Sequence, residues 1–346
     1  MDHTRARLRA DPQQAVAGGG GPALRTLINM DEPDHRKFRD LTREWFLPAN
    51  LNPVESRVKQ LAVRAIDDML ELGEEIDFVK DVAVWYPLRV IMMMLGVPEE
   101  DLPLMLRLTQ ELFGADDPDM GREVATEEQR MQTIIEFYTY FNAMTQDRRK
   151  QPGDDVASVI ANAQVDGQQI GDLEAMSYYI IVATAGHDTT SSSTAGGLLA
   201  LMEHPDEFRK LRDNLAISHL AVDEAIRWVS PVKHFLRYAT EDYELRGKPI
   251  KQGDALMMLY PSGNRDEEVF EDADQFIADR RPNRHLAFGH GAHHCLGNLL
   301  AKMEMKHLYE ELFSRVSSIE LNGEPKLIHS TFVSGLKTLP VRIKAK

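Results

Sequence analysis

The stretch Phe288-Gly289-His290-Gly291-Ala292-His293-His294-Cys295-Leu296-Gly297 contains the only cysteine among the 346 residues. A lone cysteine cannot build a disulfide framework, so its value lies in its thiolate or in its bulk. Gly289 and Gly291 let the backbone turn tightly and approach a flat group closely. From Leu296 to Val316 the apolar residues recur at helical spacing. Cys295 is therefore expected at the start of a helix, where the dipole and unpaired N–H groups stabilise negative sulfur and lower the thiol pKa.

A thiolate on a glycine-rich loop before a helix is a good axial ligand for haem iron. The same ten residues resemble the haem-binding signature of cytochromes P450, which they match at Phe288, Gly289, Gly291, His293, Cys295 and Gly297. The resemblance runs from about Asp31 to the C-terminus. It implies that the Cys295 thiolate ligates the iron of haem b (iron protoporphyrin IX). It further implies that the cofactor contacts Phe288, Gly289, His293 and Gly297. A buried structural cysteine is the commoner fate of a free thiol, but the flanking glycines favour the ligand.

Helical periodicity dominates the chain, and strand-like segments are short and few. Helices are expected over residues 33–48, 170–204 and 217–229, and short strands within 235–262. These patterns and the resemblance predict a mainly α fold with a small β region, the cytochrome P450 fold with its N-terminal portion partly missing. Residues 1–30, with the run Gly18–Gly21, are expected to form a flexible N-terminal segment. Residues 31–346 are expected to form the haem-binding catalytic domain.

The run Ala185-Gly186-His187-Asp188-Thr189 lies inside the helix expected over 170–204. Glycine in a helix costs about 1 kcal/mol relative to alanine, and a nearby threonine hydroxyl can take a backbone carbonyl and kink the helix. An acid and an alcohol beside such a kink can pass protons to a bound oxygen. The run resembles the oxygen-activation motif of cytochromes P450, which implies that Asp188 and Thr189 are catalytic and that Ala185 and Gly186 contact haem. His187 receives no role from the resemblance. An ordinary helix-packing glycine with polar neighbours is the alternative.

Glu224-Ala225-Ile226-Arg227 places a carboxylate and a guanidinium three residues apart, on one helix face. Such a pair is usually a solvated surface bridge that contributes little stability. It resembles, however, the Glu-x-x-Arg pair of cytochromes P450, which with a downstream arginine fixes the loop ahead of the cysteine. Arg280 fits that third place best, and the adjacent Arg281 is the alternative. The resemblance gives these residues a structural role in folding and haem retention.

The two propionates of haem bind cations and N–H donors. His35 and Arg39 are four residues apart and so share a helix face. In cytochromes P450 an equivalent pair binds propionate, and Arg237 and His293 match two further propionate contacts. Each of the four alone is more often a solvated charge than a ligand, but together they predict a propionate site.

Zinc is the competing interpretation of the cluster His290, His293, His294 and Cys295. Structural zinc usually draws on two spaced ligand pairs. No second cysteine exists, and the other histidines show no such pairing. The sequence therefore favours haem.

The formal net charge of −15, without a long basic run, argues against general nucleic-acid binding. The apolar windows near residues 82–97 and 178–185 are too short to span a bilayer. The N-terminus lacks the apolar stretch of a signal peptide. A cytoplasmic protein without a membrane anchor is expected, as in bacterial-type members of the family.

The resemblance implies a haem-thiolate monooxygenase that inserts one oxygen atom from O₂ into an apolar small molecule, of terpene, fatty acyl or steroid-like type. Because no flavin or nicotinamide motif is found in the chain, electrons are expected from a ferredoxin and an NAD(P)H-dependent ferredoxin reductase. A basic cluster in the first helix, expected to bind the acidic ferredoxin, comprises Arg36, Lys37, Arg39 and Arg43. The expected substrate pocket comprises Ile181, Val182, Val232, His234, Phe235 and Phe332.

Two other functions remain open at this stage. Family members normally carry a longer segment ahead of the helix of His35, and only 34 residues precede it here. The chain is therefore expected to be N-terminally shortened, with a more open cavity, and a haem-binding protein without efficient turnover is one alternative. A peroxide-driven haem enzyme is the other, although such relatives typically lack the pair that Asp188 and Thr189 form.

Overall fold

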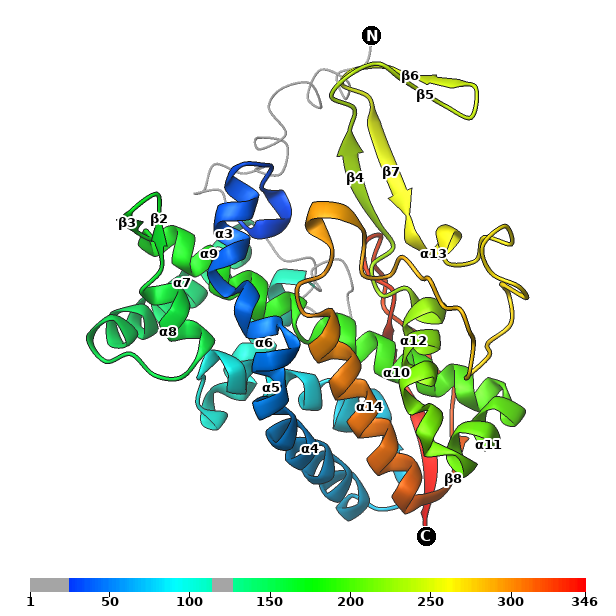
Figure 1. The fold of residues 1–346 in the computed structure, drawn as a ribbon. Coiled ribbons are helices and arrows are strands. Elements are labelled where there is room, and N and C mark those ends of the chain that lie inside the picture. The colour runs from blue at the N-terminus through cyan, green and yellow to red at the C-terminus, as the bar shows by residue number, and fades with distance from the viewer. Residues whose placement is uncertain (1–24, 114–126) are drawn as a thin grey trace.

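The computed structural model describes residues 25–113 and 127–346, which form a mainly helical body with a small β region, as expected (Figure 1). The run Gly18–Gly21 lies outside the described residues. Leu27 and Met30 belong to the segment expected to be flexible, yet both are buried in the hydrophobic core. The packed chain therefore begins before the expected boundary at residue 31.

The helices and strands of the described residues follow one another along the chain without a repeat. The helices are α3 (Asp34–Arg43), α4 (Pro48–Glu71), η3 (Val79–Ala83), α5 (Trp85–Leu95), α6 (Leu102–Phe113), α7 (Glu127–Lys150), α8 (Val156–Ala161), α9 (Asp172–Ala185), α10 (Asp188–Glu203), α11 (Pro205–Asp213), α12 (Ser218–Val229), α13 (Tyr260–Gly263) and α14 (Asn298–Arg315), with short turns η1 (Leu27–Asn29), η2 (Glu44–Phe46), η4 (Glu99–Asp101), η5 (Leu215–Ile217) and η6 (Gly291–His293). The strands are β1 (Glu75–Asp77), β2 (Gln164–Val165), β3 (Gln168–Gln169), β4 (His234–Tyr238), β5 (Tyr243–Leu245), β6 (Lys248–Ile250), β7 (Ala255–Leu259), β8 (Val316–Leu321), β9 (Lys326–Leu327), β10 (Leu336–Thr338) and β11 (Pro340–Ala345).

Two helix pairs form the centre of the body. α14 packs along α4, and α10 packs along α12 (Figure 1). Buried apolar side chains of these helices, including Met69 of α4 and Leu308 of α14, belong to one continuous core. The buried Tyr86 hydroxyl also donates a hydrogen bond to the Glu304 carbonyl, 3.1 Å away, and so ties α5 to α14. The start of α10, which carries the predicted acid and alcohol, therefore rests on a packed scaffold.

The helix expected over 170–204 is two helices, α9 and α10, with Gly186 and His187 between them. The Gly186 amide still donates to the Val182 carbonyl at 3.1 Å. A Cβ atom at Gly186 would lie 2.5 Å from Ile91 Cγ1 and 2.7 Å from the Val182 carbonyl oxygen. The close approach of α5 thus explains the glycine, and the expected kink is a break between two helices rather than a bend in one.

The β region consists of small antiparallel sheets. β1, β11 and β8 form a three-stranded sheet in that order near the C-terminus. β4 pairs with β7 over the whole length of both strands, from His234 opposite Leu259 to Tyr238 opposite Ala255, and the pair projects from the helical body (Figure 1). An isolated bridge joins Val232 to Val333 and brings the segment before β4 beside the segment before β10. These two segments meet at the end of α9, where they help to enclose a cavity.

Candidate functional site

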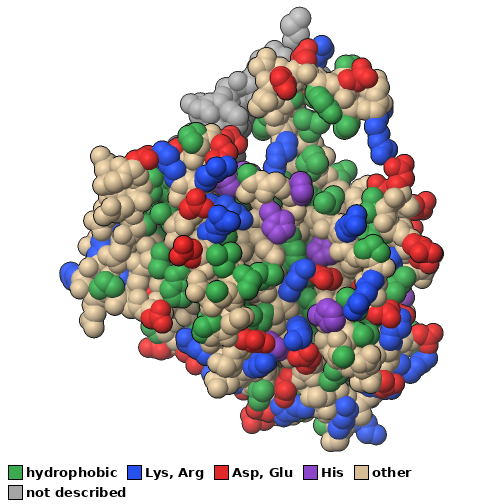
Figure 2. All heavy atoms as spheres, viewed as in Figure 1, with side chains coloured by type: hydrophobic (Ala, Val, Ile, Leu, Met, Phe, Trp, Pro, Cys, Tyr) green, Lys and Arg blue, Asp and Glu red, His purple; other side chains and the backbone are tan. Residues whose placement is uncertain are grey.

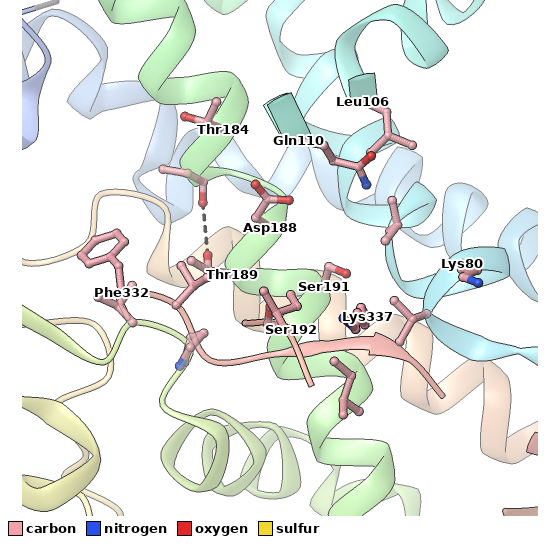
Figure 3. A pocket seen from close by; sticks show the side chains of 18 of the residues that line it. Lys80, Leu106, Gln110, Thr184, Asp188, Thr189, Ser191, Ser192, Phe332 and Lys337 are labelled. Carbon is pink, nitrogen blue, oxygen red and sulfur yellow. Dashed lines mark hydrogen bonds between the residues drawn. The ribbon is translucent and has the colours of Figure 1, made fainter. Parts of the chain in front are cut away.

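A cavity of about 610 Å³ lies beside the junction of α9 and α10 (Figure 3). Its wall comes from η3, α6, α9, α10, the segments around Val232 and Phe332, and the β9–β10 pair, and most of that wall is apolar. A volume of this size suits a small organic ligand. Some of the side chains predicted for the substrate pocket do line this cavity, namely Ile181, Val232, Phe235 and Phe332.

Two residues predicted for the substrate pocket, Val182 and His234, do not line this cavity. Consecutive residues of a helix point in directions about 100° apart, so Val182 turns toward the core when Ile181 faces the cavity. His234 and Phe235 both contact the Phe332 ring, with centroids 5.9 and 5.4 Å away, but of these two residues only Phe235 lines the cavity. The sequence prediction named neighbours without choosing between faces. It also missed several lining residues that lie far apart in the chain, including Trp85, Leu106, Gln110, Thr184, Ser191 and Ser192.

Asp188 and Thr189 both line the cavity, as does Ala185. The Thr189 hydroxyl donates to the Ala185 carbonyl, 3.2 Å away, across the break between the helices (Figure 3). Asp188 projects into the cavity and retains 38% side-chain exposure. An acid and an alcohol therefore stand side by side on the wall, where both can reach water or a bound oxygen atom.

His187, to which the sequence assigned no role, is fully buried next to this pair. Its Nε2 lies 3.0 Å from an Asp188 carboxylate oxygen. Burial by itself lowers the pKa of His187, but the Asp188 carboxylate and the Ala183 carbonyl outweigh it and raise that pKa above its ordinary value. The local sequence gives no signal for this burial, because the side chains that meet His187 come from distant segments, including Thr109 of α6.

The loop around Cys295 turns back on itself before α14. Gly289 and Gly291 have φ angles of +70° and +78°, a region that other residues enter only with strain. The Cys295 amide donates to the Phe288 carbonyl at 2.8 Å, which closes the loop. α14 begins only at Asn298, so the cysteine stands three residues ahead of the helix rather than at its first turn.

The structure corrects the expected acidity of the Cys295 thiol. Burial raises the pKa of Cys295, and the Gly297 N–H and the charge of Arg39 offset this only in part. The helix dipole acts within the first turn, and Cys295 lies outside it. The polypeptide alone therefore does not favour the thiolate, as expected of a cysteine that becomes a thiolate through a bound metal.

The four predicted propionate residues lie near one another, although they come from three distant segments. The rings of His35 and His293 lie in contact at a tilt of 34°, with centroids 4.0 Å apart. The Arg39 guanidinium donates to the His294 carbonyl at 2.6 Å. Burial lowers the pKa of His293, and the positive charges of Arg237 and Arg39 lower it further.

This cluster fits an anionic group. His35 Nδ1 is buried without a hydrogen-bond partner among the described residues, although a Glu32 carboxylate oxygen lies 3.7 Å away. Two guanidinium groups repel one another and hold nearby histidines neutral unless an anion joins them. A propionate would supply both the missing acceptor and the missing charge, so the residues present suit the group that the sequence implies.

Glu224 and Arg227 are fully buried and form a bidentate ion pair, with N–O distances of 2.7 and 2.8 Å. Arg280 donates to the same carboxylate at 3.0 Å, whereas the adjacent Arg281 is exposed. Arg227 also donates to the carbonyls of Asn264 and Ala273. The cluster therefore anchors the long segment that leads to the Cys295 loop.

The basic cluster predicted on α3 is largely neutralised by neighbouring acids. Lys37 pairs with Asp166 at 2.6 Å, Arg36 lies 3.7 Å from Glu32, and Arg43 lies 3.8 Å from Asp40. Figure 2 shows acidic side chains scattered among the Lys and Arg side chains of this face. The sequence prediction counted the basic residues of this helix and omitted the acids beside them. The net field for an acidic partner is accordingly weaker than the sequence suggested.

Two other findings concern metals and membranes. In residues 25–113 and 127–346, no group of three or more His, Cys, Asp or Glu side chains is placed to hold a metal ion. Over the same residues, no helix has both the length and the apolar character to cross a bilayer.

Comparisons with known proteins agree with this geometry. The cytochrome P450 family model matches residues 22–345. Cytochrome P450-terp from a Pseudomonas species is 46% identical over 336 residues, which cover 95% of this chain and 78% of that protein. Linalool 8-monooxygenase of Pseudomonas putida is 33% identical over 319 residues, covering 92% of this chain and 78% of the relative.

Solved structures lead to the same family. The crystal structure of CYP108D1 from Novosphingobium aromaticivorans superimposes with a TM-score of 0.87 at 46% identity, covering 97% of this chain and 79% of that one. Members of this family use a haem-thiolate cofactor. On sequence, fold and relatives alike, the chain belongs to the cytochrome P450 family and is a bacterial-type monooxygenase.

Proposed function

We propose that this monooxygenase inserts one oxygen atom from O₂ into a terpene-sized apolar molecule, with haem b as cofactor and a ferredoxin with its NAD(P)H-dependent reductase as electron source. The observation that carries the proposal is the cavity of about 610 Å³, apolar over most of its wall, with Asp188 and Thr189 exposed to it. Relatives named for terpene chemistry, cytochrome P450-terp and linalool 8-monooxygenase, support the substrate class. Fatty acyl and steroid-like molecules are the other candidates, because the relatives include a methyl-branched lipid omega-hydroxylase and a steroid C26-monooxygenase.

Different residues would bind different parts of the cofactor. Haem, when bound, supplies the activation of O₂. Cys295 would hold its iron through the thiolate sulfur, and the loop glycines Gly289 and Gly297 would leave room for the cofactor beside the cysteine. The propionates would be held by His35, Arg39, Arg237 and His293. Ala185, which lines the cavity with only a methyl group, would leave room for the ring, whereas the Cβ position of Gly186 faces Ile91 of α5.

The cavity wall would hold the substrate and move protons. Ile181, Val232 and Phe332 would orient an apolar molecule and exclude water from it, which limits side reactions. The Thr189 hydroxyl can pass a proton toward an oxygen atom in the cavity, and the Asp188 carboxyl can replace that proton. The Thr189 hydroxyl at present bonds the Ala185 carbonyl, so it is held at a fixed position beside the cavity.

A substrate screen tests the proposal. The haem-loaded protein is titrated with linalool, a terpineol, a long-chain fatty acid and a steroid, and the spectral change on binding is recorded. Tight binding and hydroxylation of the terpene alcohols, with steady O₂ uptake that requires ferredoxin, reductase and NAD(P)H, is the expected result. Tight binding of the steroid or fatty acid alone would overturn the substrate class. Product formed with peroxide but not with the reductase system would overturn the electron source.

A further inference from the structure

The buried ring of His187 faces hydrogen-bond acceptors at both nitrogens. Nδ1 lies 2.9 Å from the Ala183 carbonyl oxygen, one turn back along α9. Nε2 lies 3.0 Å from an Asp188 carboxylate oxygen and 3.3 Å from the Thr109 hydroxyl of α6. The Thr109 hydroxyl also lies 3.0 Å from the Leu106 carbonyl oxygen and can donate its single hydrogen there, which leaves a lone pair for the ring.

These contacts fix how many hydrogens the site requires. A carbonyl only accepts, so Nδ1 must carry hydrogen. A neutral ring would then present a bare lone pair on Nε2 to a carboxylate 3.0 Å away, a repulsive contact inside a buried site. The contact becomes favourable when one further hydrogen lies between Nε2 and Asp188.

We propose that His187 is a positioning residue for Asp188 and stores a proton for it on Nε2. The proposal rests on the catalytic roles proposed above for Asp188 and Thr189. It extends them by naming the group that holds the carboxylate in place and keeps a proton within reach.

The two members of the pair differ in access to solvent. The ring is fully buried, whereas the Asp188 side chain is 38% exposed and lies on the cavity wall (Figure 3). A proton on Nε2 therefore leaves and returns through Asp188. It moves first from Nε2 to the near carboxylate oxygen, which leaves a neutral ring and a protonated Asp188. Asp188 then gives this proton to a water molecule in the cavity, and a hydronium ion from solvent later returns one proton to the pair.

The charged environment of the ring is simple. Asp188 is the charged group that acts on His187, and its attraction, with hydrogen bonds to Asp188 and Ala183, outweighs burial. Neutral Thr109 is the partner that α6 supplies. Removing the charge of Asp188 should therefore leave a buried ring that prefers to be neutral.

Nitrogen NMR of the holoenzyme tests the stored proton without turnover. Protein labelled with ¹⁵N-histidine is studied in the reduced, CO-bound form, which is diamagnetic, and His187→Gln identifies the signal. At pH 7 we expect both ring nitrogens of His187 to carry hydrogen in the wild type, and Nε2 to lose its hydrogen in Asp188→Asn. A bare Nε2 in the wild type, or an unchanged ring in Asp188→Asn, would overturn the proposal.

A double-mutant cycle separates positioning from a general structural effect. Product formed per NAD(P)H is measured for the wild type, His187→Gln, Asp188→Asn and the double variant. If His187 acts through Asp188, each single change lowers the yield about a hundredfold, at the lower end of the range for general acid–base groups, and the double variant is no worse than Asp188→Asn. Multiplying losses would show that His187 acts independently and overturn the proposal.

The chain contains a matched control for His187→Gln. His204 has the same bond to the carbonyl four residues back, with Nδ1 2.7 Å from the Ala200 oxygen, but it lies at the far end of α10 against Trp228 and Phe276. His204→Gln should keep the wild-type yield, and an equal loss there would overturn the proposal. If Asp188→Asn itself keeps a full yield, the proton route of the proposed function fails, while NMR still reports the protonation of His187 separately.

Discussion

Two groups of buried or half-buried charges, one centred on α12 and one at the start of α10, lie at neighbouring helices of the core and differ in what surrounds them. Glu224, Arg227 and Arg280 are sealed from solvent, and their charged groups bond to one another and to backbone carbonyls. His187 and Asp188 also form a pair, but the His187 ring is buried, whereas the Asp188 side chain is open to the cavity. Enclosed and satisfied charges stabilise a fold, whereas a charge pair with one open side can exchange a proton. The comparison predicts opposite outcomes for mutations in the two places.

The largest loss of stability should come from mutating the buried cluster of Glu224, Arg227 and Arg280. Glu224→Ala leaves two arginines buried without their carboxylate, which costs about 3–5 kcal/mol of unfolding free energy. We expect little folded, haem-loaded protein from this variant, measured by soluble yield and by chemical denaturation. Arg281→Ala, next to the cluster but exposed, is the control and should keep wild-type stability. Wild-type stability in Glu224→Ala would show that the cluster is not structural.

A mutation on the cavity wall should spare the fold and impair the reaction. Thr189→Ala removes a hydroxyl that bonds a single backbone carbonyl, so unfolding free energy should change by about 1 kcal/mol or less. Product per NAD(P)H should fall about tenfold or more as reducing equivalents are released as peroxide, because proton delivery is misdirected. Substrate binding, read from the spectral titration, should remain. A full product yield would mean that the acid–alcohol interpretation is wrong.

The open pair should also show in the pH dependence of stability. The pKa of His187 is raised in the folded protein, so its contribution is fully present below the ordinary histidine pKa near 6.5 and is lost as pH rises through the folded value. Because Asp188 is partly exposed, we expect Asp188→Asn to cost about 1 kcal/mol near pH 6. The difference from wild type should shrink at higher pH. If the difference in stability between wild type and Asp188→Asn grew with pH, the pair would not stabilise the fold through a protonated His187.

Most residues of the candidate site could be named from the sequence, because they lie in short motifs. The cysteine loop, the acid–alcohol pair and the Glu224–Arg227 pair each occupy a few consecutive residues. Contacts between segments that are far apart in the chain could not be predicted from the sequence. His187 contacts Thr109 of α6, some eighty residues earlier in the chain, and the acids that neutralise α3 include Asp166 on a distant turn. The choice of Ile181 over Val182, and of Phe235 over His234, likewise required knowing which face meets the cavity.

The smallest effect should be found on the surface of α3. Since Arg36, Lys37 and Arg43 already face acids, charge reversal at Arg36 should slow the first electron transfer from ferredoxin by about threefold or less, in line with an exposed ion pair. Added salt should have a similarly modest effect. Stopped-flow reduction of the haem measures both. A slowing by orders of magnitude would show that α3 forms the main docking surface after all.

The central claim is that Cys295 binds haem iron as a thiolate, and one spectrum tests it most directly. Burial raises the thiol pKa in the polypeptide alone, so the thiol must lose its proton when the sulfur binds the iron. The intact protein, loaded with haem, reduced and exposed to carbon monoxide, should show the red-shifted Soret band of thiolate ligation, and Cys295→Ser should lose it. A histidine-type spectrum from freshly prepared wild-type protein would contradict the account.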